Sequence, residues 1–404
     1  MRLARLIAAA TLLLPLAAAQ GQYVHTQGQQ IVDGSGKPLL LHGINLGNWM
    51  VTEGYMFHFE GGPQSEREIE EFVNEMLGPS RAAAFWKTYR DTYISQQDIH
   101  QIKQAGFDSV RIPIHWKLFT TEDAEGFRLL DRVISWCKQE GLLVVIDLHA
   151  APGGQTGANI DDSNGWPWLY TDADAQQQTL TLWKRIAHRY RNEPAVLGYD
   201  LLNEPLPHYA QMRQFDSKLE PLYKRITEEI RTEDKHHAII LGGAKWDSDF
   251  TVFGKPFDPN LIYQFHAYWK PPVQATIQKY VDFRTANNVP LWLGESGENK
   301  DDWVADFARL CEKNNVGWAF WPYKKMDATS SPVTYPQPEH WAEIVEYAKN
   351  DRNLSHIEDR EKKRPSQDTI NAAFDSLLQN IQFVHETRNM GYIKALLPDS
   401  KLQP

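Results

Sequence analysis

The sequence of 404 residues has only two cysteines, Cys137 and Cys311, which lie far apart in helix-like patterns. A disulfide framework is therefore not expected, and the stability of the chain must come from one large hydrophobic core. Long runs of like charge are also missing, as is any apolar run beyond the N-terminus long enough to span a membrane. These absences favour a single globular domain over a disulfide scaffold or a polytopic membrane protein.

An excess of positive charge is absent too. The formal net charge is −10, and it becomes −12 without the first 19 residues, so nucleic acid is not an expected partner. No histidine or cysteine pair has the spacing typical of zinc ligands, so we expect neither a metal nor another cofactor. The sequence does contain 14 tryptophans, whose flat rings can stack on sugar rings or pack in a core.

The N-terminus has the three regions of a secretory signal peptide. Arg2 and Arg5 precede an apolar stretch at 6–16 and then Ala17, Ala18 and Ala19. We expect cleavage after Ala19 and a secreted or periplasmic mature protein without a membrane span. An uncleaved membrane anchor is the alternative.

Short apolar stretches alternate with amphipathic helical patterns along most of the chain. We expect eight strands at 42–46, 109–114, 142–148, 196–202, 238–241, 261–265, 290–293 and 317–321. Helical patterns intervene, for example at 95–105, 130–140, 172–191 and 212–231. A strand-then-helix repeat of this kind predicts an α/β fold, a (β/α)8 TIM barrel, as one catalytic domain over residues 20–350.

Three segments fall outside this repeat. A β-hairpin is expected at 23–41, with its turn at 33–36, and residues 49–93 form an insertion that should lie over the barrel. Residues 351–404 are expected to form a linker, at 351–363, followed by an extra C-terminal helix packed on the barrel. We expect the protein to be a monomer.

Polar and aromatic residues lie at or just after the ends of these strands. In a barrel of this type the loops at the C-terminal ends of the strands form the open, reactive face. Eight such residues together predict a site there: Arg111, His149, Asn203, Glu204, His266, Tyr268, Glu295 and Trp321.

Two of these residues are carboxylic acids on the fourth and seventh strands, Glu204 in Asn203-Glu204-Pro205 and Glu295. Hydrolysis of a glycosidic bond needs one acid to protonate the departing oxygen and a second carboxylate at the anomeric carbon. If the two carboxyl groups are about 5 Å apart, the reaction proceeds by double displacement with retention. Glu204 would then be the acid/base and Glu295 the nucleophile, with Arg111 and Tyr268 as donors to its charge.

The same motifs, in this order, resemble glycoside hydrolase family 5, the cellulase-like clan of retaining barrel enzymes, over residues 24–347. The motifs are 110–113, 147–149, 203–205, 266–268, Glu295 and Trp321. The resemblance implies the same roles for Glu204 and Glu295, and it implies that Asn203 contacts the 2-hydroxyl beside the cleaved bond. It places Arg111, His149, His266 and Tyr268 around that sugar and Trp321 beneath it.

A second group of motifs, at 45–49 with Glu53 and at 149–155 with 162–165, is similar to the exo-β-1,3-glucanase branch. There a glutamate near the first strand closes the pocket by gripping hydroxyls of the terminal sugar, which implies that role for Glu53. The resemblance adds Asn45, Trp49 and Gln155 to the expected substrate-binding residues. The segment 57–93 departs from the fungal enzymes of the branch, so chain-end and internal cleavage both stay open.

The sequence is compatible with three functions. The first is a retaining β-glucan hydrolase that acts on the ends of β-1,3-linked chains. The second is an endo-β-1,4-glucanase with an open cleft, and the third is a catalytically silent carbohydrate-binding barrel. The presence of both carboxylates argues against the third.

Overall fold

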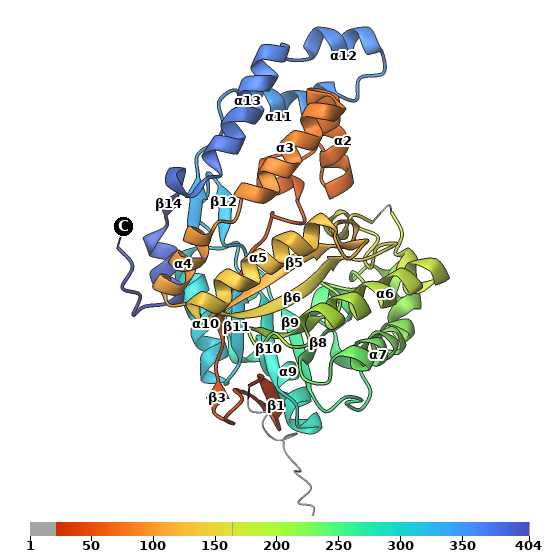
Figure 1. The fold of residues 1–404 in the computed structure, drawn as a ribbon, viewed down its shortest axis with the longest axis vertical. Coiled ribbons are helices and arrows are strands. Elements are labelled where there is room, and N and C mark those ends of the chain that lie inside the picture. Colours follow the sequence, from red (N-terminus) through yellow and green to blue (C-terminus); the bar gives the residue numbers. More distant parts are fainter. Residues whose placement is uncertain (1–21, 164, 404) are drawn as a thin grey trace, which may run out of the picture.

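The computed structural model describes residues 22–163 and 165–403. Its centre is a closed barrel of eight parallel strands, in the order β10-β11-β4-β5-β6-β7-β8-β9, with β9 paired to β10 (Figure 1). The strands are β4 (His42–Asn45), β5 (Ser109–His115), β6 (Leu143–Ala150), β7 (Val196–Asp200), β8 (Ala238–Gly242), β9 (Leu261–His266), β10 (Leu291–Glu295) and β11 (Gly317–Phe320). The predicted TIM barrel is confirmed, and each expected strand overlaps one of these eight.

Helices follow most of the strands and cover the outside of the barrel. They are α4 (Gln96–Ala105), α5 (Glu125–Glu140), α6 (Ala173–Tyr190), α7 (Asp216–Glu233), α9 (Gln274–Asn287) and α10 (Asp301–Lys313). The four-residue α8 (Ala244–Asp247) instead lies at the C-terminal end of β8, and α11 (Trp341–Glu346) comes later in the chain, after β13. Helix α4 begins at a capping box, in which the Ser95 hydroxyl accepts from the backbone N–H of Asp98 and the Asp98 carboxylate accepts from that of Ser95. It ends at Gly106, which has the left-handed conformation common at helix C-termini.

A small N-terminal sheet closes the end of the barrel opposite the catalytic face. It consists of β1 (His25–Gln27), β2 (Gln30–Val32) and β3 (Pro38–Leu39), which pair antiparallel, so the expected hairpin is present with one additional strand. The turn before β3 is held by Asp33, whose carboxylate accepts from the backbone N–H groups of Ser35 and Lys37. Val24, Ile31 and Leu41 pack with apolar side chains inside the barrel, such as Ile240 and Trp292.

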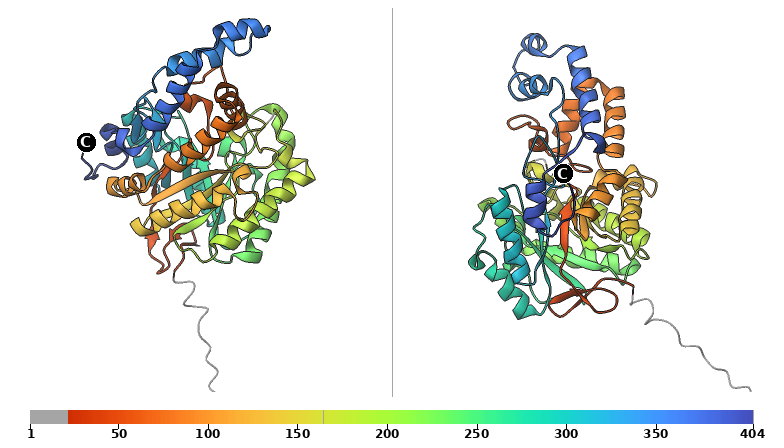
Figure 2. Two further views of the ribbon diagram at one scale, coloured as in Figure 1. Left: turned by 45° about the horizontal axis from the view of Figure 1, so that its top comes forward. Right: turned by 90° about the vertical axis from the view of Figure 1, so that its left-hand side faces the viewer.

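The insertion after β4 and the C-terminal segment form a second layer, which we call the upper lobe. It contains α2 (Glu66–Leu77), α3 (Pro79–Thr92), α11 and α13 (Gln367–Asn380). Figures 1 and 2 show α13 running along α2 and α3 at the end of the barrel away from β1. The rings of Phe85 and Phe374 meet edge to face at 5.3 Å, and Phe59 stacks on Trp341 at 5.5 Å. Segments nearly 300 residues apart therefore share one core.

The region predicted as a linker is partly helical, because α12 (Ile357–Lys363) lies within it, although none of its residues is buried. A third sheet joins β12 (Lys324–Met326), β13 (Val333–Tyr335) and β14 (Thr387–Arg388). The chain ends with α14 (Met390–Leu396), which packs on α10. Short 3-10 and π segments complete the fold: η1 (Gly54–Phe57), η2 (Trp116–Phe119), η3 (Asn159–Asp161), η4 (Trp168–Tyr170), η5 (Ala210–Phe215), η6 (Phe250–Val252), η7 (Tyr347–Asp351) and η8 (Phe383–His385).

Among residues 22–163 and 165–403, none of the helices combines the length and the apolar character that a membrane span needs. The expected signal peptide and its cleavage site at Ala19 lie outside the described residues, as does Asn164.

Candidate active site

Barrel geometry brings the predicted residues together at one end of the strands. His266 and Glu295 are the last residues of β9 and β10, and Glu204 follows β7 by four residues. Glu204 has a left-handed backbone, with φ of 44°, which is uncommon for a residue with a side chain. Such backbone strain is concentrated at functional sites, where the surrounding structure fixes the direction of a side chain.

The two carboxylates face one another. Oxygen atoms of Glu204 and Glu295 and a ring nitrogen of His266 all lie within 4.8 Å of each other. Nδ1 of His266 is 2.9 Å from Oε1 of Glu204 and 3.6 Å from Oε2 of Glu295. A separation of about 5 Å between the carboxyl groups is the one found in retaining glycosidases, because it leaves no room for a water between the second carboxylate and the anomeric carbon.

The environments of the two acids differ. Burial raises the pKa of Glu204 to about 7, against the opposing influence of His149 and Arg111. Glu295 instead accepts from two donors, Nη1 of Arg111 at 2.5 Å and the hydroxyl of Tyr268 at 3.0 Å. Burial thus favours the protonated form of Glu204 up to about pH 7, while Glu295 accepts from two donors, and this difference is what acid and nucleophile require.

Arg111 organises the floor of the site. Its side chain is fully buried, its Nε donates to Asp200 at 2.9 Å, and its Nη2 lies 3.0 Å from Asp147 and 2.9 Å from Oδ1 of Asn203. Burial opposes its charge, but the carboxylates of Asp147, Asp200 and Glu295 raise the pKa of the guanidinium. A buried cation with this many carboxylate partners stays charged and holds its neighbours in place.

His149 and Asn203 lie beside this network. Nδ1 of His149 is 2.7 Å from Asp147, and its Nε2 is 3.3 Å from Nδ2 of Asn203. Burial lowers the pKa of His149 to about 4, so its ring is neutral at neutral pH. Its plane is nearly parallel to that of Trp321, with ring centroids 5.5 Å apart. Asn203 is therefore fixed by Arg111 on one side and His149 on the other.

A cavity of about 1140 Å³ opens above these groups. It is lined by residues from seven segments of the chain: Glu53, Tyr55, His149, Ile160, Asn203, Glu204, His208, Lys245, Trp246, Ser248, His266, Ala267, Tyr268, Trp269, Lys270, Ala275, Thr276, Lys279, Tyr280, Glu295, Glu298 and Trp321. Eight of the predicted site residues are among them. A ninth, Arg111, reaches the cavity only through Glu295 and Asn203.

Three other predicted binding residues are not among the residues that line the cavity, and their contact with substrate stays a prediction. Asn45 accepts from Arg111 and donates to backbone oxygens of β10 and β11, while Nε1 of Trp49 donates to the carbonyl of Arg90. The amide of Gln155 donates to the carbonyls of His149 and Asn203. Their hydrogen-bonding groups are used within the protein, so we propose them as positioning residues.

Sequence reasoning missed three contributors to the site. Tyr55, in η1, accepts from Nε1 of Trp321 at 2.7 Å. Glu298 pairs with Lys325 at 2.5 Å beside Tyr55. Asp247 is fully buried, accepts from the backbone N–H of Glu204 at 3.2 Å and lies 3.3 Å from Nε2 of His266. All three lie in the segments that follow barrel strands, where the sequence has no periodic pattern from which the direction of a side chain can be predicted.

Within the described part of the chain, the group with the spacing of a metal site is the same trio, Glu204, His266 and Glu295. The chemistry of this trio does not suit a cation. Glu295 already neutralises the buried guanidinium of Arg111, and the raised pKa of Glu204 removes the second negative charge near neutral pH. The arrangement is suited to proton transfer and nucleophilic attack.

Comparison with known proteins gives a family match and related enzymes. Residues 69–327 match the family model described as cellulase, glycosyl hydrolase family 5. The chain is 28% identical to a beta-xylosidase of Phanerodontia chrysosporium over 75% of this chain and 71% of that protein. It is 25% identical to endoglucanase C of Acetivibrio thermocellus, over 61% of this chain and 89% of the relative.

A third relative matches a shorter part of this chain. The Aspergillus fumigatus protein named probable glucan 1,3-beta-glucosidase A is 31% identical over 50% of this chain and 49% of its own length. Among solved structures, the rutinosidase of Aspergillus niger has a TM-score of 0.57 at 16% identity, covering 72% of this chain and 91% of that one. That likeness concerns the fold alone. The family match, by contrast, covers most of the barrel and includes both facing carboxylates, so this chain belongs to glycosyl hydrolase family 5 and is a glycoside hydrolase.

Proposed function

We propose that the enzyme hydrolyses β-glucosidic bonds with retention, using Glu204 as acid/base and Glu295 as nucleophile. The observation that carries this proposal is the distance of no more than 4.8 Å between their carboxylate oxygens. Glu295 attacks the anomeric carbon while protonated Glu204 gives its proton to the departing oxygen. Glu204, now a carboxylate, then removes a proton from the water that releases the sugar.

The sugar at the point of cleavage would lie between Trp321 and the two acids. Asn203 is within reach of its 2-hydroxyl, because Arg111 occupies the amide oxygen and leaves Nδ2 facing the cavity beside His149. Tyr268 donates to Glu295 before attack, and its hydroxyl is freed as the new bond forms. The Tyr268 hydrogen bond fixes the carboxylate of Glu295 before attack, while the contact from Asn203 to the 2-hydroxyl would strengthen as positive charge develops on the sugar, which is the requirement for stabilising a transition state.

We further propose that the enzyme acts on chain ends of β-1,3-glucan. The support comes from the cavity end beyond Trp321, where Glu53, Tyr55 and the pair of Glu298 with Lys325 stand close together. Burial, reinforced by the charges of Glu295 and Glu204, raises the pKa of Glu53 well above its ordinary value, so its carboxyl can donate to a sugar hydroxyl. The similarity to a glucan 1,3-beta-glucosidase is consistent with such a pocket.

An endo-β-1,4-glucanase is the second candidate, favoured by the relative endoglucanase C, of which the match covers 89%. Product analysis separates the two. Glucose as the sole early product from laminarin would support chain-end action, whereas a rapid loss of viscosity of carboxymethylcellulose or lichenan with mixed oligomers would exclude it. Aryl β-xylosides belong in the same assay, because another relative is a beta-xylosidase.

Azide rescue identifies the two catalytic roles. With an activated aryl glycoside, Glu295→Ala plus azide should yield the inverted glycosyl azide, because azide enters from the vacated face. Glu204→Ala should yield the retained azide, because the covalent intermediate still forms on Glu295. Glu204→Gln and Glu295→Gln should each lower kcat by at least about 100-fold. Normal turnover in either amide variant would refute the role assigned to that residue, whereas a wild type without turnover would favour the catalytically silent carbohydrate-binding barrel.

The signal peptide stays a prediction, and with it export of the enzyme. Expression of the full chain in a bacterium, followed by N-terminal sequencing of the mature protein, should give Gln20 as the first residue. A protein that retains residues 1–19 in the membrane fraction would favour the uncleaved anchor.

A further inference from the structure

One wall of the cavity carries three lysines that the proposed reaction does not use. Lys245 follows β8, Lys270 follows β9, and Lys279 is on α9, and all three line the cavity together with Ser248 and Thr276. The charges of Lys245 and Lys270 also affect Lys279: burial lowers the pKa of its ammonium group, the nearby Asp249 raises it, and the two lysines lower it further. The positive charges of Lys245 and Lys270 therefore both act on the ammonium group of Lys279.

The negative charge of the cavity lies elsewhere. Its lining carboxylates are Glu204 and Glu295 at the centre, and Glu53 and Glu298 beside Tyr55. Within the part of the chain that the structure describes, two carboxylates lie near the lysine wall: Asp249, which pairs with Lys245, and Asp216, whose pKa is raised by burial and lowered in part by the charge of Lys245. Three cations with two carboxylates still leave this wall with a positive charge.

Two of these ammonium groups have N–H donors that are not used in hydrogen bonds within the protein. Nζ of Lys279 donates to the carbonyl of Ser248 at 2.6 Å, which uses one of its three protons. Lys270 has an exposed side chain, and among the described residues no hydrogen bond or ion pair of its ammonium group is found. The wall can therefore donate to a ligand without first breaking contacts in the protein.

The backbone fixes the start of this wall. Lys245, Trp246 and Asp247 all have positive φ, of 57°, 59° and 55°. Three consecutive residues with side chains in the left-handed region are costly and persist only where the surroundings impose them. The run directs Asp247 beneath Glu204 and leaves Lys245 and Trp246 at the cavity, with Nε1 of Trp246 donating to His208 at 2.9 Å.

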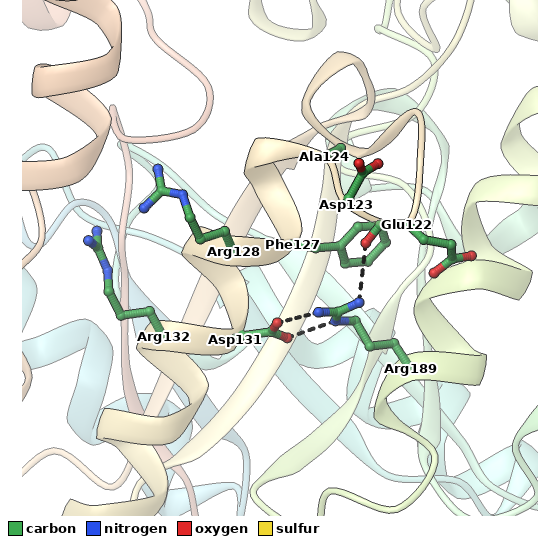
Figure 3. Close-up of a pocket in the computed structure, with 8 residues that line it drawn as sticks. All are labelled: Glu122, Asp123, Ala124, Phe127, Arg128, Asp131, Arg132 and Arg189. Atoms are coloured by element: carbon green, nitrogen blue, oxygen red, sulfur yellow. Dashed lines mark hydrogen bonds and ion pairs between the residues drawn. The ribbon is translucent and has the colours of Figure 1, made fainter.

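Another hollow with basic residues provides a contrast. It lies on the side of the barrel and is lined by Arg128, Arg132 and Arg189, but also by Glu122, Asp123 and Asp131 (Figure 3). Figure 3 shows Arg189 joined to Asp131, and Arg128 and Arg132 both contact Asp91. Its charges balance and its guanidinium groups are occupied, so it gives no reason to expect an anion. The lysine wall differs in both respects.

The position of Glu204 indicates which part of a bound substrate lies near the lysines. The acid protonates the departing oxygen, so the leaving group lies on the Glu204 side, while the sugar that reacts lies over Trp321. His208, Lys245 and Trp246 are on the chain segments that follow Glu204 and β8, away from Glu53 and Tyr55. We propose that the lysine wall binds an anionic group, a carboxylate or a sulfate ester, carried by the leaving-group portion of the substrate. This inference rests on the proposed function, because it uses Glu204 as the acid.

A matched pair of substrates tests the proposal. The 4-carboxyphenyl and 4-methoxycarbonylphenyl β-glucosides differ by one charge on the leaving group, and a second pair, the 4-sulfophenyl glucoside and its sulfonamide, distinguishes carboxylate from sulfur oxyanions. The ratio of kcat/KM for the charged over the neutral substrate is measured for the wild type and for Lys270→Gln/Lys279→Gln. Comparing ratios between proteins cancels the difference in leaving-group reactivity. The ratio should fall roughly fivefold in the double variant, the range expected for two partly exposed charge pairs.

Two controls accompany this measurement. Lys138→Gln/Lys184→Gln removes the same net charge from surface helices α5 and α6, where the lysines pair with Glu193 and Glu229, and it should leave the ratio at the wild-type value. Raising NaCl from about 0.02 to about 0.5 M should lower the wild-type ratio toward that of the double variant, because salt screens exposed charges. Lys270→Gln alone repeats the test at a position where no internal contact is lost.

The outcomes are distinguishable. The inference would be overturned if the kcat/KM ratio were equal in the wild type and both lysine-wall variants and did not respond to salt. In that case, hydrolysis of the neutral glucoside would still support the proposed function. A ratio that falls equally in the surface control would also overturn the inference. A wild-type enzyme that turns over no β-glycoside would instead overturn the proposed function, and this inference with it.

Discussion

The guanidinium of Arg111 and the carboxylate of Glu295 form a buried contact, with 2.5 Å between Nη1 and Oε1. Arg111 is completely inaccessible, so the contact is not screened by water. Because the same guanidinium also binds Asp147, Asp200 and Asn203, the nucleophile is tied to the floor of the barrel. The position of Glu295 therefore depends on a network that also supports the fold.

Arg111→Met should damage both stability and activity. Asp147 and Asp200 would lose their buried counter-charge, which costs about 3–5 kcal/mol of unfolding free energy. The loss of a charged donor to Glu295 should lower kcat by at least about 100-fold. Urea unfolding and turnover of an aryl glycoside measure the two effects. An unchanged unfolding free energy would show that the carboxylates are not held as the structure has them.

Tyr268→Phe is the matched comparison, because it removes a single hydroxyl that donates to Oε2 of Glu295 at 3.0 Å. The ring remains, so the unfolding free energy should change by only about 1 kcal/mol. Turnover should still fall by about 100-fold, since a donor at the nucleophile is lost. Loss of stability as large as that of Arg111→Met would contradict this separation of roles.

The pKa of Glu204 predicts the alkaline limb of the pH profile. With a folded-state pKa of about 7, Glu204 is protonated below neutral pH and loses its proton above it. For a substrate with a poor leaving group, kcat/KM should fall as pH rises through about 7. In Glu204→Gln, assayed with an activated leaving group that needs no acid, this limb should be absent. Persistence of the limb in the variant would assign it to another group.

The same shift predicts how stability depends on pH. Between the ordinary value of 4.5 and about 7, folded Glu204 keeps a proton that the unfolded chain releases, so stability declines as pH rises through this window. By about pH 8 the cost is on the order of 3 kcal/mol. Glu204→Gln removes it, so the variant should be similar to the wild type near pH 4 and more stable at pH 8. A stability difference independent of pH would contradict the raised pKa.

The close packing of Gly47 against Trp321 gives a prediction about the sugar platform. A Cβ at position 47 would lie 2.5 Å from the indole ring, well inside contact distance. Gly47→Ala should displace Trp321, lowering kcat/KM roughly tenfold and the unfolding free energy by about 1–3 kcal/mol. Tyr55→Phe, which removes only the hydrogen bond to Nε1 of Trp321, should have a smaller effect on kcat/KM. The reverse order would show that the hydrogen bond, and not the packing, positions the ring.

The parts of the fold that sequence alone predicted are those with local periodicity. Each barrel strand is an apolar run, and the residue that ends it, such as His266 or Glu295, must point to the catalytic face whatever the loops do. The sequence alone therefore predicts that Glu204 and Glu295 lie at the same face of the barrel. Helix α5 begins at Glu125, five residues before the predicted start at residue 130. The prediction missed the first turn because that turn has few apolar residues.

The remainder depended on contacts between segments distant in the chain. Sheet β12-β13-β14 pairs residues about 55 positions apart, and the upper lobe buries Phe374 against Phe85. No local pattern encodes these pairings. Asp247 was missed for a related reason: its direction comes from three left-handed residues in a row, which propensities do not favour for residues with side chains. Trp49, an aromatic residue in a site-like motif, packs in the hydrophobic core, and its expected contact with substrate stays a prediction.

The C-terminal segment is attached to the barrel by a buried cation, Lys324, at the start of β12. Its ammonium group lies 3.0 Å from Asp98 on α4, contacts Glu386 near β14, and donates to the carbonyls of Tyr93 and Ile381. Lys324→Met would leave two buried carboxylates without their partner, which should lower the unfolding free energy by about 3–5 kcal/mol. Hydrogen exchange should rise first in residues 381–396, because that segment loses its tie to the barrel.

A surface ion pair that also joins the C-terminal segment to an earlier part of the chain serves as the control for Lys324→Met. Arg81 on α3 binds Asp375 on α13 at 2.8 Å, with both side chains exposed. Exposed pairs contribute about 0–1 kcal/mol, so Arg81→Met should leave unfolding and exchange close to the wild type. If the two variants were equally destabilised, burial of the Lys324 cluster could not be the cause. If only Lys324→Met loosens residues 381–396, the buried charge, and not the number of contacts, holds the C-terminal segment on the catalytic barrel.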